Sequence, residues 1–384
     1  MKVMVIGRCL PEYNSSYGMF EFDQARALSQ KGLDVVYAYS DNRSIKIRRR
    51  FGFNKTYRDN IKCVGISFPS GGLPSNLYDC IKTRALMRIV RYLDGQNWTP
   101  DVVYAHFPLL TLTREFVSNL TESTIPLVCM EHWTQVLEGN LSKRNKALLD
   151  FCVSHAAYYC CVSEDLKLAV QKETDTQSNR ILVIPNYVKS PPRIKSETLK
   201  GDAVVQFISA GRIEPVKCFG LLVRAFMQCA QEINAVLLIA GEGSLKRSLQ
   251  REVDRAKMND RIIFLGWQTK EELYQLLYSS DIYVTASSVE TFGMPIVESW
   301  LTGLPCVAAN NNALRSYFSD SNGLLFKVDD LSSLRKMLMK AAAKSRNGSY
   351  RPREIETKAK NEFSEESVLT QIVNCLKSAS YKYE

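Results

Sequence analysis

The run Val204-Val-Gln-Phe-Ile-Ser209 leads directly into the polar segment Ala210-Gly-Arg-Ile-Glu-Pro-Val-Lys217. A short apolar run that ends in such a loop predicts a strand buried on both faces of a parallel sheet. Similar runs follow it and alternate with helical patterns: Val236 to Ala240, Ile262 to Leu265, Ile282 to Thr285, Cys306 to Ala308 and Leu324 to Phe326. We therefore expect an α/β domain with a doubly wound parallel sheet over residues 204–363.

The first half of the chain also alternates short apolar runs with helical patterns. Its strand-like runs are Val3 to Ile6, Val35 to Tyr39, Val102 to Ala105, Leu127 to Met130, Tyr158 to Val162 and Leu182 to Ile184. They predict a first α/β domain over residues 1–186 and an interdomain connection over 187–203, which lacks apolar periodicity. Ser364 is a plausible N-cap of a last helix, 364–384, whose apolar face we expect to dock on the first domain.

Composition agrees with a two-domain globular protein. The chain has 384 residues, of which 45% are hydrophobic and 23% charged, and a net charge of +10 that favours anionic partners. Its eleven cysteines are odd in number and scattered, which indicates reduced, buried thiols and neither a disulfide framework nor a cysteine metal site. The apolar run Val3 to Ile6 is too short for a signal peptide or membrane anchor, so a cytoplasmic location is expected.

The segment Glu290-Thr-Phe-Gly-Met-Pro-Ile-Val-Glu298 follows one predicted strand and opens a predicted helix. Pro295 suits a first helical turn, Gly293 permits close backbone approach, and the free amides of a helix start attract a polar ligand. Glu290 and Glu298 can each accept paired hydrogen bonds from the vicinal hydroxyls of a sugar or a ribose. The alternative is that an acidic residue in a first helical turn only compensates the helix dipole.

This Glu-x7-Glu spacing around Phe-Gly-Met-Pro closely resembles the donor-site motif of family-four glycosyltransferases, many of which act in bacterial polysaccharide synthesis. The resemblance implies the GT-B fold, in which two Rossmann-like domains face each other across a cleft. It also implies that Glu290 contacts the transferred sugar and that Glu298 holds the nucleotide ribose. Backbone contacts would come from Phe292, Gly293 and Met294.

A second segment supports the same resemblance. Ser209-Ala-Gly-Arg-Ile-Glu-Pro-Val-Lys217, which includes Gly211, is similar to the family segment whose cations clamp the donor diphosphate. The resemblance gives this role to Arg212 and Lys217. Cleavage of the sugar–phosphate bond builds negative charge on the diphosphate, and fixed cations stabilise that transition state. Taken alone, either residue would be interpreted as a solvated surface cation.

Glycines and a base-binding segment complete the expected donor site. Gly241 and Gly243 match a family glycine pair that would let the backbone pass close to the donor, with turn geometry as the alternative. Gly18 stands where relatives keep a glycine-rich loop near the phosphates, although many of them have two adjacent glycines there. Residues 262–266 resemble the segment that lines the base pocket, with Trp267 and Gln268 nearby.

His132 follows the predicted strand Leu127 to Met130, where the family places a histidine of the catalytic cleft. A near-neutral pKa would allow it either to hydrogen-bond the donor sugar or to steady the departing acceptor proton. A structural histidine at a strand end is the alternative. His106 has a similar position after Val102 to Ala105, and we interpret it as mainly structural.

The expected reaction is sugar transfer from a nucleoside diphosphate sugar to an acceptor hydroxyl, on a saccharide or lipid-linked precursor. The resemblance implies retention of anomeric configuration, with the leaving phosphate helping to remove the acceptor proton and no protein nucleophile. Because the chain lacks an Asp-x-Asp motif at a strand end, we expect no metal or other cofactor. Two alternatives are a sugar-nucleotide epimerase of the same fold and a basic nucleic-acid-binding protein, for which no base-reading motif is present.

Two basic segments suggest peripheral contact with an anionic membrane on its inner face. Between Arg43 and Arg58 lie seven Lys or Arg residues and no acid, interleaved with large apolar side chains. The stretch Ile81 to Leu93 places Arg84, Arg88 and Arg91 on one helical face. Each basic residue near such a surface contributes about 1 kcal/mol. The alternative is a solvated basic face.

Overall fold

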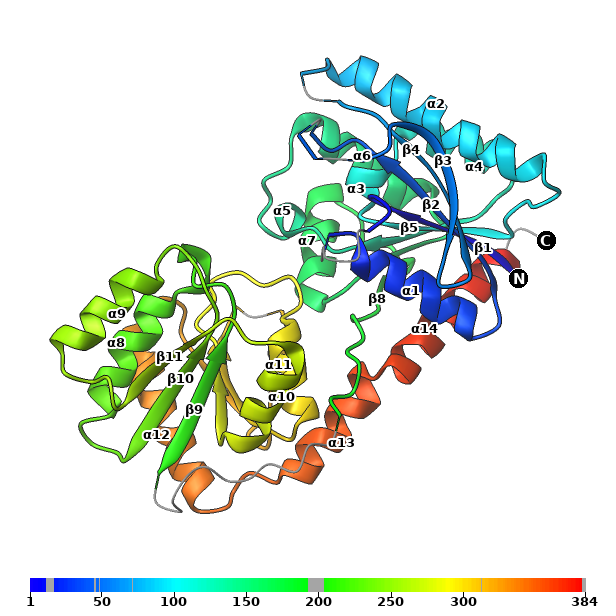
Figure 1. Cartoon of the computed structure of the whole chain (residues 1–384). Helices are drawn as coiled ribbons and strands as arrows, with labels where there is room; N and C mark the ends of the chain where they lie inside the picture. The colour runs from blue at the N-terminus through cyan, green and yellow to red at the C-terminus, as the bar shows by residue number, and fades with distance from the viewer. Residues whose placement is uncertain are drawn as a thin grey trace. The chain divides into compact units, whose positions relative to one another are not determined.

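The computed structural model describes the whole chain except residues 12–16, 45, 48, 71, 193–203, 312 and 382–384. The chain divides into two compact units, Met1–Ile184 with Leu369–Glu384, and Pro185–Val368. Each unit is built on its own sheet with helices on both faces (Figure 1). Most of the expected interdomain connection, 187–203, lies outside the described residues.

The first unit contains an eight-stranded sheet in the order β3-β4-β2-β1-β5-β6-β7-β8. Its strands are β1 (Lys2–Gly7), β2 (Asp34–Asp41), β3 (Gly52–Arg58), β4 (Ile61–Ser67), β5 (Val102–His106), β6 (Leu127–Glu131), β7 (Tyr158–Cys161) and β8 (Ile181–Val183). All neighbouring pairs are parallel except β3 with β4. The sequence prediction of a parallel sheet is therefore confirmed for its central strands.

The hairpin β3–β4 was missed by the sequence prediction, which took residues 43–58 as a basic, membrane-facing segment. Asp59 and Asn60 connect the two strands, and both have positive φ, of 49° and 63°. Two such residues in succession are the signature of a tight hairpin turn whose twist matches the strands. The basic side chains of β3 thus belong to an antiparallel strand at the edge of the sheet.

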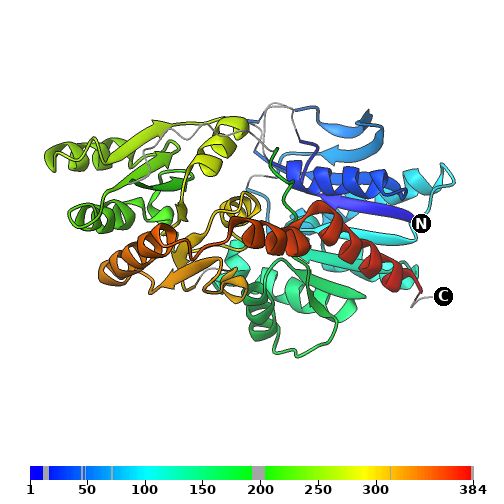
Figure 2. The ribbon, with the colours of Figure 1, turned by 90° about the horizontal axis from the view of Figure 1, so that it is seen from below.

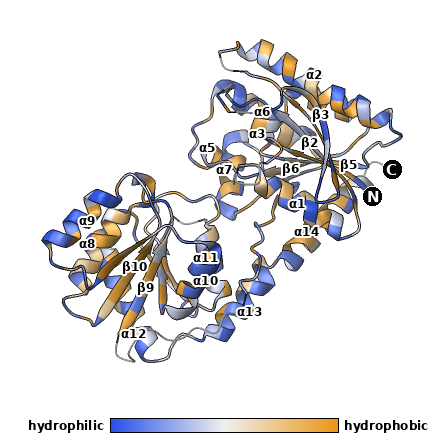
Figure 3. Ribbon diagram, viewed as in Figure 1, coloured by the Kyte–Doolittle hydropathy of each residue, from blue (hydrophilic) through white to orange (hydrophobic). Residues whose placement is uncertain are grey.

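Helices connect these strands and bury their apolar faces against the sheet. They are α1 (Met19–Gln30), α2 (Ser75–Asp94), α3 (Pro108–Thr111), α4 (Arg114–Glu122), α5 (Thr134–Leu137), α6 (Lys143–His155) and α7 (Glu164–Thr174). Most strands are hydrophobic along their length, with the hydrophilic edge strand β3 as an exception, whereas the helices alternate between hydrophobic and hydrophilic faces (Figure 3). This is the hydropathy pattern of a sheet covered on both faces.

The second unit contains a six-stranded, all-parallel sheet in the order β11-β10-β9-β12-β13-β14. Its strands are β9 (Val205–Ala210), β10 (Ala235–Ala240), β11 (Ile262–Gly266), β12 (Ile282–Val284), β13 (Cys306–Ala309) and β14 (Gly323–Phe326). Each one coincides with a run predicted from the sequence. Because β9 is followed by β10 on one side and joined by β12 on the other, the strand order reverses between β9 and β12.

The helices of the second unit flank its sheet on both faces, as Figures 1 and 2 show. They are η1 (Pro215–Lys217), α8 (Phe219–Cys229), α9 (Lys246–Arg255), α10 (Lys270–Ser279), α11 (Met294–Leu301), η2 (Arg315–Tyr317), α12 (Leu331–Arg346) and α13 (Pro352–Phe363). Buried side chains such as Phe207, Phe226 and Leu338 form one apolar core between the sheet and its helices. Burial of such a core is the main stabilising term of the unit.

The last helix, α14 (Glu365–Tyr381), starts at the expected residue. The hydroxyl of Ser364 accepts a hydrogen bond from the Ser367 amide at 3.3 Å, as an N-cap does. Residues from Leu369 onward group with the first unit, where the hydroxyls of Ser378 and Tyr158 lie 2.8 Å apart and the Cys375 and Cys160 sulfurs 3.8 Å apart. No helix within the described part of the chain is long and apolar enough to cross a membrane.

Candidate functional site

The carboxyl ends of β9, β10, β11 and β12 form the candidate site of the second unit. In open α/β sheets, ligands bind outside these ends, at the point where the strand order reverses. Two cavities lie there and share Ala210 and Gly211. The larger, of about 520 Å³, extends over the ends of β10 and β11, and the smaller, of about 50 Å³, lies between β9, β12 and α11. All predicted site residues except Gly18 and His132 belong to this unit.

The loops after β9 and β10 are bound tightly to each other. The Gly211 amide donates to the Ala240 carbonyl at 3.0 Å, and the Ile213 amide donates to the Glu242 carbonyl at 2.8 Å. A Cβ atom on Gly241 would lie 1.9 Å from the Gly211 oxygen, and one on Gly243 would lie 2.4 Å from the Ile213 oxygen. The absent side chains of Gly241 and Gly243 therefore face protein backbone. Glycine is therefore required at both positions by the packing of the two loops. Both residues also line the larger cavity, and close approach of their backbone to the donor stays a prediction.

Lys217 and Glu290 meet in the smaller cavity. The Lys217 ammonium lies 2.5 Å from a carboxylate oxygen of Glu290, with side-chain exposures of 26% and 17%. η1 carries Lys217 after β9, whereas Glu290 lies in the loop between β12 and α11. The structure thus brings a predicted phosphate-binding cation and a predicted sugar-binding carboxylate into one ion pair. Each charge is largely neutralised by its partner, while the ammonium keeps further N–H donors and the carboxylate keeps further lone pairs for a ligand.

Helix α11 begins as its sequence predicts. Gly293 precedes it with a φ of 94°, in the left-handed region that favours glycine, and Pro295 lies in the first turn after Met294. The Phe292 ring is buried and packs edge-on against Phe363, with ring centroids 5.8 Å apart, so that it anchors the loop before the helix. The first turn of α11 contains no acidic residue, so neither Glu290 nor Glu298 has the position that dipole compensation requires.

Glu298 is buried, with 5% of its surface exposed, and its carboxylate forms an ion pair with the ammonium of Lys270. Lys270 begins α10, directly after the N-cap Thr269, whose side chain shares a capping box with Glu272. Lys270 was not among the predicted site residues. The Thr-x-x-Glu pattern reveals a helix start there, but nothing local shows that this start lies beside Glu298.

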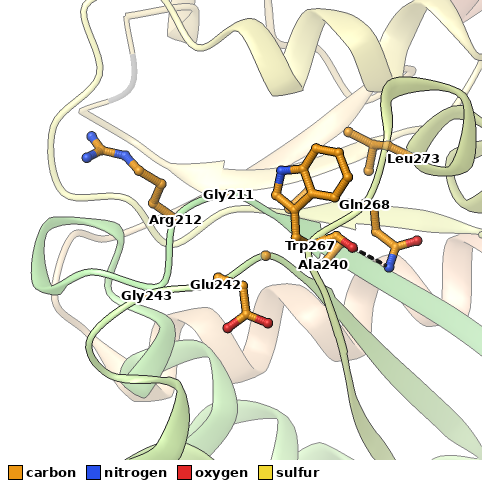
Figure 4. Close-up of a pocket in the computed structure, with 10 residues that line it drawn as sticks. Gly211, Arg212, Ala240, Glu242, Gly243, Trp267, Gln268 and Leu273 are labelled. Carbon is orange, nitrogen blue, oxygen red and sulfur yellow. Dashed lines mark hydrogen bonds between the residues drawn. The ribbon is translucent and has the colours of Figure 1, made fainter. Parts of the chain in front are cut away.

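The larger cavity is lined by Arg212 and Trp267, together with Gln268 and the glycine loops. Figure 4 shows the indole of Trp267 and the side chain of Arg212 at this cavity, reaching it from the loops after β11 and β9. The Trp267 side chain is 71% exposed, an unusual exposure for tryptophan. Gln268 donates hydrogen bonds from its amide nitrogen to the carbonyls of Leu265 and Trp267, both at 3.1 Å, which fixes its orientation.

In the first unit, His132 forms a pair with His106. His106 Nδ1 and His132 Nε2 lie 3.1 Å apart, and the two rings are stacked with centroids 5.3 Å apart. His106 ends β5 and His132 follows β6, the neighbouring strand. Both are buried, with exposures of 0% and 8%. The strand-end position predicted for His132 is correct, and His106 is its direct partner.

The expectation of a near-neutral pKa for His132 was wrong. Burial lowers the pKa of His132 well below its usual value, and His106 and Arg8 lower it further. Burial likewise lowers the pKa of His106 to about 3. Both rings are therefore neutral at pH 7, and one of the facing nitrogens donates to the other. A neutral His132 can exchange a hydrogen bond with a hydroxyl group, but it lacks the second ring proton that an imidazolium would supply as a general acid.

Glu131, which ends β6, holds the backbone of His132 through its carboxylate. One carboxylate oxygen accepts the backbone N–H groups of His132 and Trp133, both at 2.9 Å, and the other accepts the Tyr159 hydroxyl at 2.7 Å. Its burial raises the pKa of Glu131 to about 7, against the lowering effect of these hydrogen bonds. Neither Glu131 nor Tyr159 was a predicted site residue, because only the tertiary structure shows that the Glu131 carboxylate points inward.

Gly18 precedes α1 with a φ of 81°. A Cβ atom there would lie 2.8 Å from the Cys9 sulfur, so that glycine is required both by the backbone and by packing. Residues 12–16, the preceding part of the predicted phosphate loop, lie outside the described residues. The contact between Gly18 and the donor phosphates stays a prediction.

Comparison with known proteins covers nearly the whole chain. Residues 22–190 match the family model described as Glycosyltransferase Family 4, and residues 192–361 match the model described as Glycosyl transferases group 1. The boundary between the two models falls close to the boundary between the two units, at residues 184 and 185.

Several curated relatives share about a quarter of the aligned residues. A UDP-Gal:alpha-D-GlcNAc-diphosphoundecaprenol alpha-1,3-galactosyltransferase of Escherichia coli is 27% identical over 67% of this chain and 70% of its own. An N-acetyl-alpha-D-glucosaminyl L-malate synthase of Bacillus anthracis is 22% identical over 72% of this chain and 74% of its own. The yeast phosphatidylinositol N-acetylglucosaminyltransferase GPI3 subunit is 26% identical over 52% of this chain, and the match spans 46% of that subunit.

Solved structures confirm the GT-B fold. The lipopolysaccharide outer core galactosyltransferase WaaB superimposes with a TM-score of 0.74 at 17% identity, over 98% of this chain and 99% of its own. Anabaena HepE in complex with UDP gives a TM-score of 0.72 at 16% identity, over 98% of this chain and 100% of its own. Since the two family models together match residues 22–190 and 192–361, this chain belongs to the group 1 glycosyltransferases of family 4.

Proposed function

We propose that this protein transfers a sugar from a nucleoside diphosphate sugar to an acceptor hydroxyl, with retention of anomeric configuration and without a metal ion. The observation that carries this proposal is the ion pair of Lys217 and Glu290, which lies at the strand reversal beside a larger cavity. A cation and a carboxylate at one point match a ligand in which a phosphate adjoins a polyhydroxylated sugar.

The reaction follows from these charges. The donor diphosphate would take the Lys217 ammonium together with Arg212, which has no ion-pair partner among the described residues. Glu290 would then be free to accept hydrogen bonds from the sugar hydroxyls. As the sugar–phosphate bond breaks, negative charge grows on the leaving diphosphate, and the fixed cations stabilise that state more than the ground state. In this mechanism the leaving phosphate receives the acceptor proton.

We propose uridine diphosphate as the nucleotide of the donor. The E. coli relative is named for a UDP-galactose donor, and HepE was solved with UDP. The larger cavity of about 520 Å³ offers Trp267 and the ordered Gln268 to a base. Glu298 lines neither cavity and is paired with Lys270, so its role toward the ribose rests on the family resemblance alone. The relatives named above are transferases and synthases, so they give no support to the epimerase alternative.

We propose a lipid-linked or saccharide acceptor, reached at an anionic membrane surface. The two basic segments that suggested such contact lie side by side: the Arg88 guanidinium lies 5.1 Å from the Phe53 ring, and the Lys55 ammonium lies 5.9 Å from the Tyr92 ring. They therefore form one basic surface on β3 and α2. Exposed apolar side chains, Ile47, Phe51, Tyr57 and Leu77, accompany it. Such a mixture of cations and apolar groups is typical of interfacial binding.

Ligand-induced thermal stabilisation tests this function. The purified protein is melted with UDP, GDP, ADP, their sugars and a single-stranded oligonucleotide, with and without a metal chelator. We expect selective stabilisation by UDP and one UDP-sugar, unchanged by the chelator, and its loss in Arg212→Ala. Stabilisation by the oligonucleotide and by none of the nucleotides would overturn the proposal. Loss of the effect on chelation would contradict metal independence alone.

A further inference from the structure

A further cavity, of about 340 Å³, lies at the carboxyl ends of β2 and β4 in the first unit. Its size is within the range of small-molecule sites. Four basic side chains line it, those of Arg43, Arg49, Arg50 and Lys55, together with one acidic side chain, Asp41. The cavity is thus strongly positive, and neither the donor site nor the histidine pair uses it.

Two of these cations, Arg43 and Arg49, are paired with groups of the protein itself. Arg43 binds Asp41 through two nitrogens, at 3.0 Å and 2.8 Å, and the Arg49 Nε lies 3.4 Å from the same carboxylate. Arg49 also donates to the carbonyls of Ser44 and Ile47, at 2.8 Å and 3.2 Å. Its side chain is only 7% exposed, so Arg49 stabilises the wall of the cavity and offers little of its charge to a ligand.

The other two cations are left for a ligand. Arg50 and Lys55 are exposed, and among the described residues neither has a carboxylate within ion-pair distance. With one acid against four bases, the described lining carries three positive charges in excess. A concave surface concentrates this field at its centre, where it attracts an anion. Guanidinium groups in particular match the geometry of phosphate oxygens.

The position of the cavity indicates which substrate carries that anion. β2 and β4 run parallel to β1, β5 and β6, so the cavity lies at the same edge of the sheet as His106 and His132. The donor diphosphate has its own cations in the second unit. We propose that this pocket binds a phosphate or diphosphate group on the acceptor, and so positions the acceptor in the first unit. This inference rests on the proposed transferase function.

Pyrophosphate binding in the presence of saturating UDP tests the pocket. UDP occupies the donor cations, so that calorimetry with inorganic pyrophosphate reports the remaining anion site. The pocket variant is Arg50→Gln with Lys55→Gln. Its control is Lys143→Gln with Lys172→Gln, which removes two exposed charges of the same unit outside the pocket lining. Equal melting temperatures of the two variants establish that both are folded.

We expect the pocket variant to bind pyrophosphate about tenfold more weakly or worse, because it lacks two charge-assisted contacts. The control should stay within about twofold of the wild type. Equal affinities in all three proteins, equal weakening in both variants, or no binding by the wild type would each overturn the proposal. UDP binding is measured in the same experiment: its absence in the wild type would refute the transferase function and leave the pocket result standing.

Vesicles distinguish the two sources of such a phosphate. Phosphatidylcholine vesicles with and without phosphatidylglycerol are sedimented with each protein. Arg50→Gln alone is sedimented as well, because it spares Lys55 of the basic surface on β3 and α2. A loss of binding to the anionic vesicles in this single variant and in the pocket variant, but not in the control, would support the proposal with a lipid headgroup as the source. Equal vesicle binding by the two variants, combined with selective loss of pyrophosphate binding, would support it with a phosphate on the acceptor itself.

Discussion

The Lys217 ammonium lies 2.5 Å from the Glu290 carboxylate, although 73 positions separate the two residues in the chain. Their elements follow β9 and β12, which are adjacent strands of one sheet. The pair holds two opposite charges at the point where the donor is expected to bind. Without a ligand, each neutralises the other and keeps the loop before α11 close to η1.

Replacement of Glu290 by Gln tests this relationship. We expect the transfer rate to fall by about 100-fold or more, as is typical when one preorganised group is lost from a polar reaction site. UDP affinity should be unchanged or higher, because the positive charge of Lys217 is no longer neutralised by a carboxylate. The matched control is Glu252→Gln. In the wild type the carboxylate of Glu252, on α9, lies 2.7 Å from the guanidinium of Arg224, on α8. A Glu290→Gln enzyme with wild-type turnover would refute the assignment.

Gly241→Ala should destabilise the second unit by more than about 2 kcal/mol, because the new Cβ atom would overlap the Gly211 oxygen and the local φ is 145°. Gly348→Ala is the control. Gly348 also has a positive φ, of 69°, but a Cβ atom there would meet nothing within 4 Å. It should cost only about 1–2 kcal/mol, the backbone term alone. Chemical denaturation measures both, and equal losses would show that the loop contact is unimportant.

The histidine pair should make stability depend on pH. His106 binds a proton in the unfolded chain below about pH 6.5 but in the folded protein only near pH 3. Between these values the unfolded state binds more protons, so the free energy of unfolding falls as pH falls, by up to about 1.4 kcal/mol per pH unit. Glu131, whose pKa is raised to about 7, acts in the opposite sense.

His106→Phe separates the two contributions. The variant keeps a ring at this position and loses the titrating group, whereas Glu131 is unchanged. We expect the stability advantage of the wild type over His106→Phe to shrink as pH falls from 6.5 to 4, measured by urea unfolding at each pH. An advantage that is constant over this range would show that His106 does not stay neutral in the fold.

Trp267→Ala should weaken UDP binding by about tenfold, because stacking of an aromatic side chain on a base contributes roughly 1–3 kcal/mol. Trp267→Phe keeps an aromatic face and should retain most of the affinity. Calorimetric titration with UDP measures both variants. Since Trp267 is 71% exposed at the cavity, its fluorescence should also respond to UDP in the wild type. Equal affinities of the Ala variant and the wild type would remove Trp267 from the base site.

Local sequence patterns predicted every strand of both units except β3 and β4. Central parallel strands are buried on both faces, so that they leave continuous apolar runs in the sequence. β3 is an edge strand with most of its side chains exposed, and its basic residues gave no such run. The start of α11 could also be predicted from the sequence, because Gly293 and Pro295 have conformational preferences that need no tertiary partner.

The pairing of charges was decided only by the tertiary structure. Lys217 and Glu290, Glu298 and Lys270, and His106 and His132 are each brought together by neighbouring loops or strands from distant parts of the chain. Burial then set the protonation of the two histidines, which no local pattern encodes. Strand and helix propensity are properties of a short segment, whereas a hydrogen bond or a pKa depends on which segments the fold places side by side and on how much water they exclude.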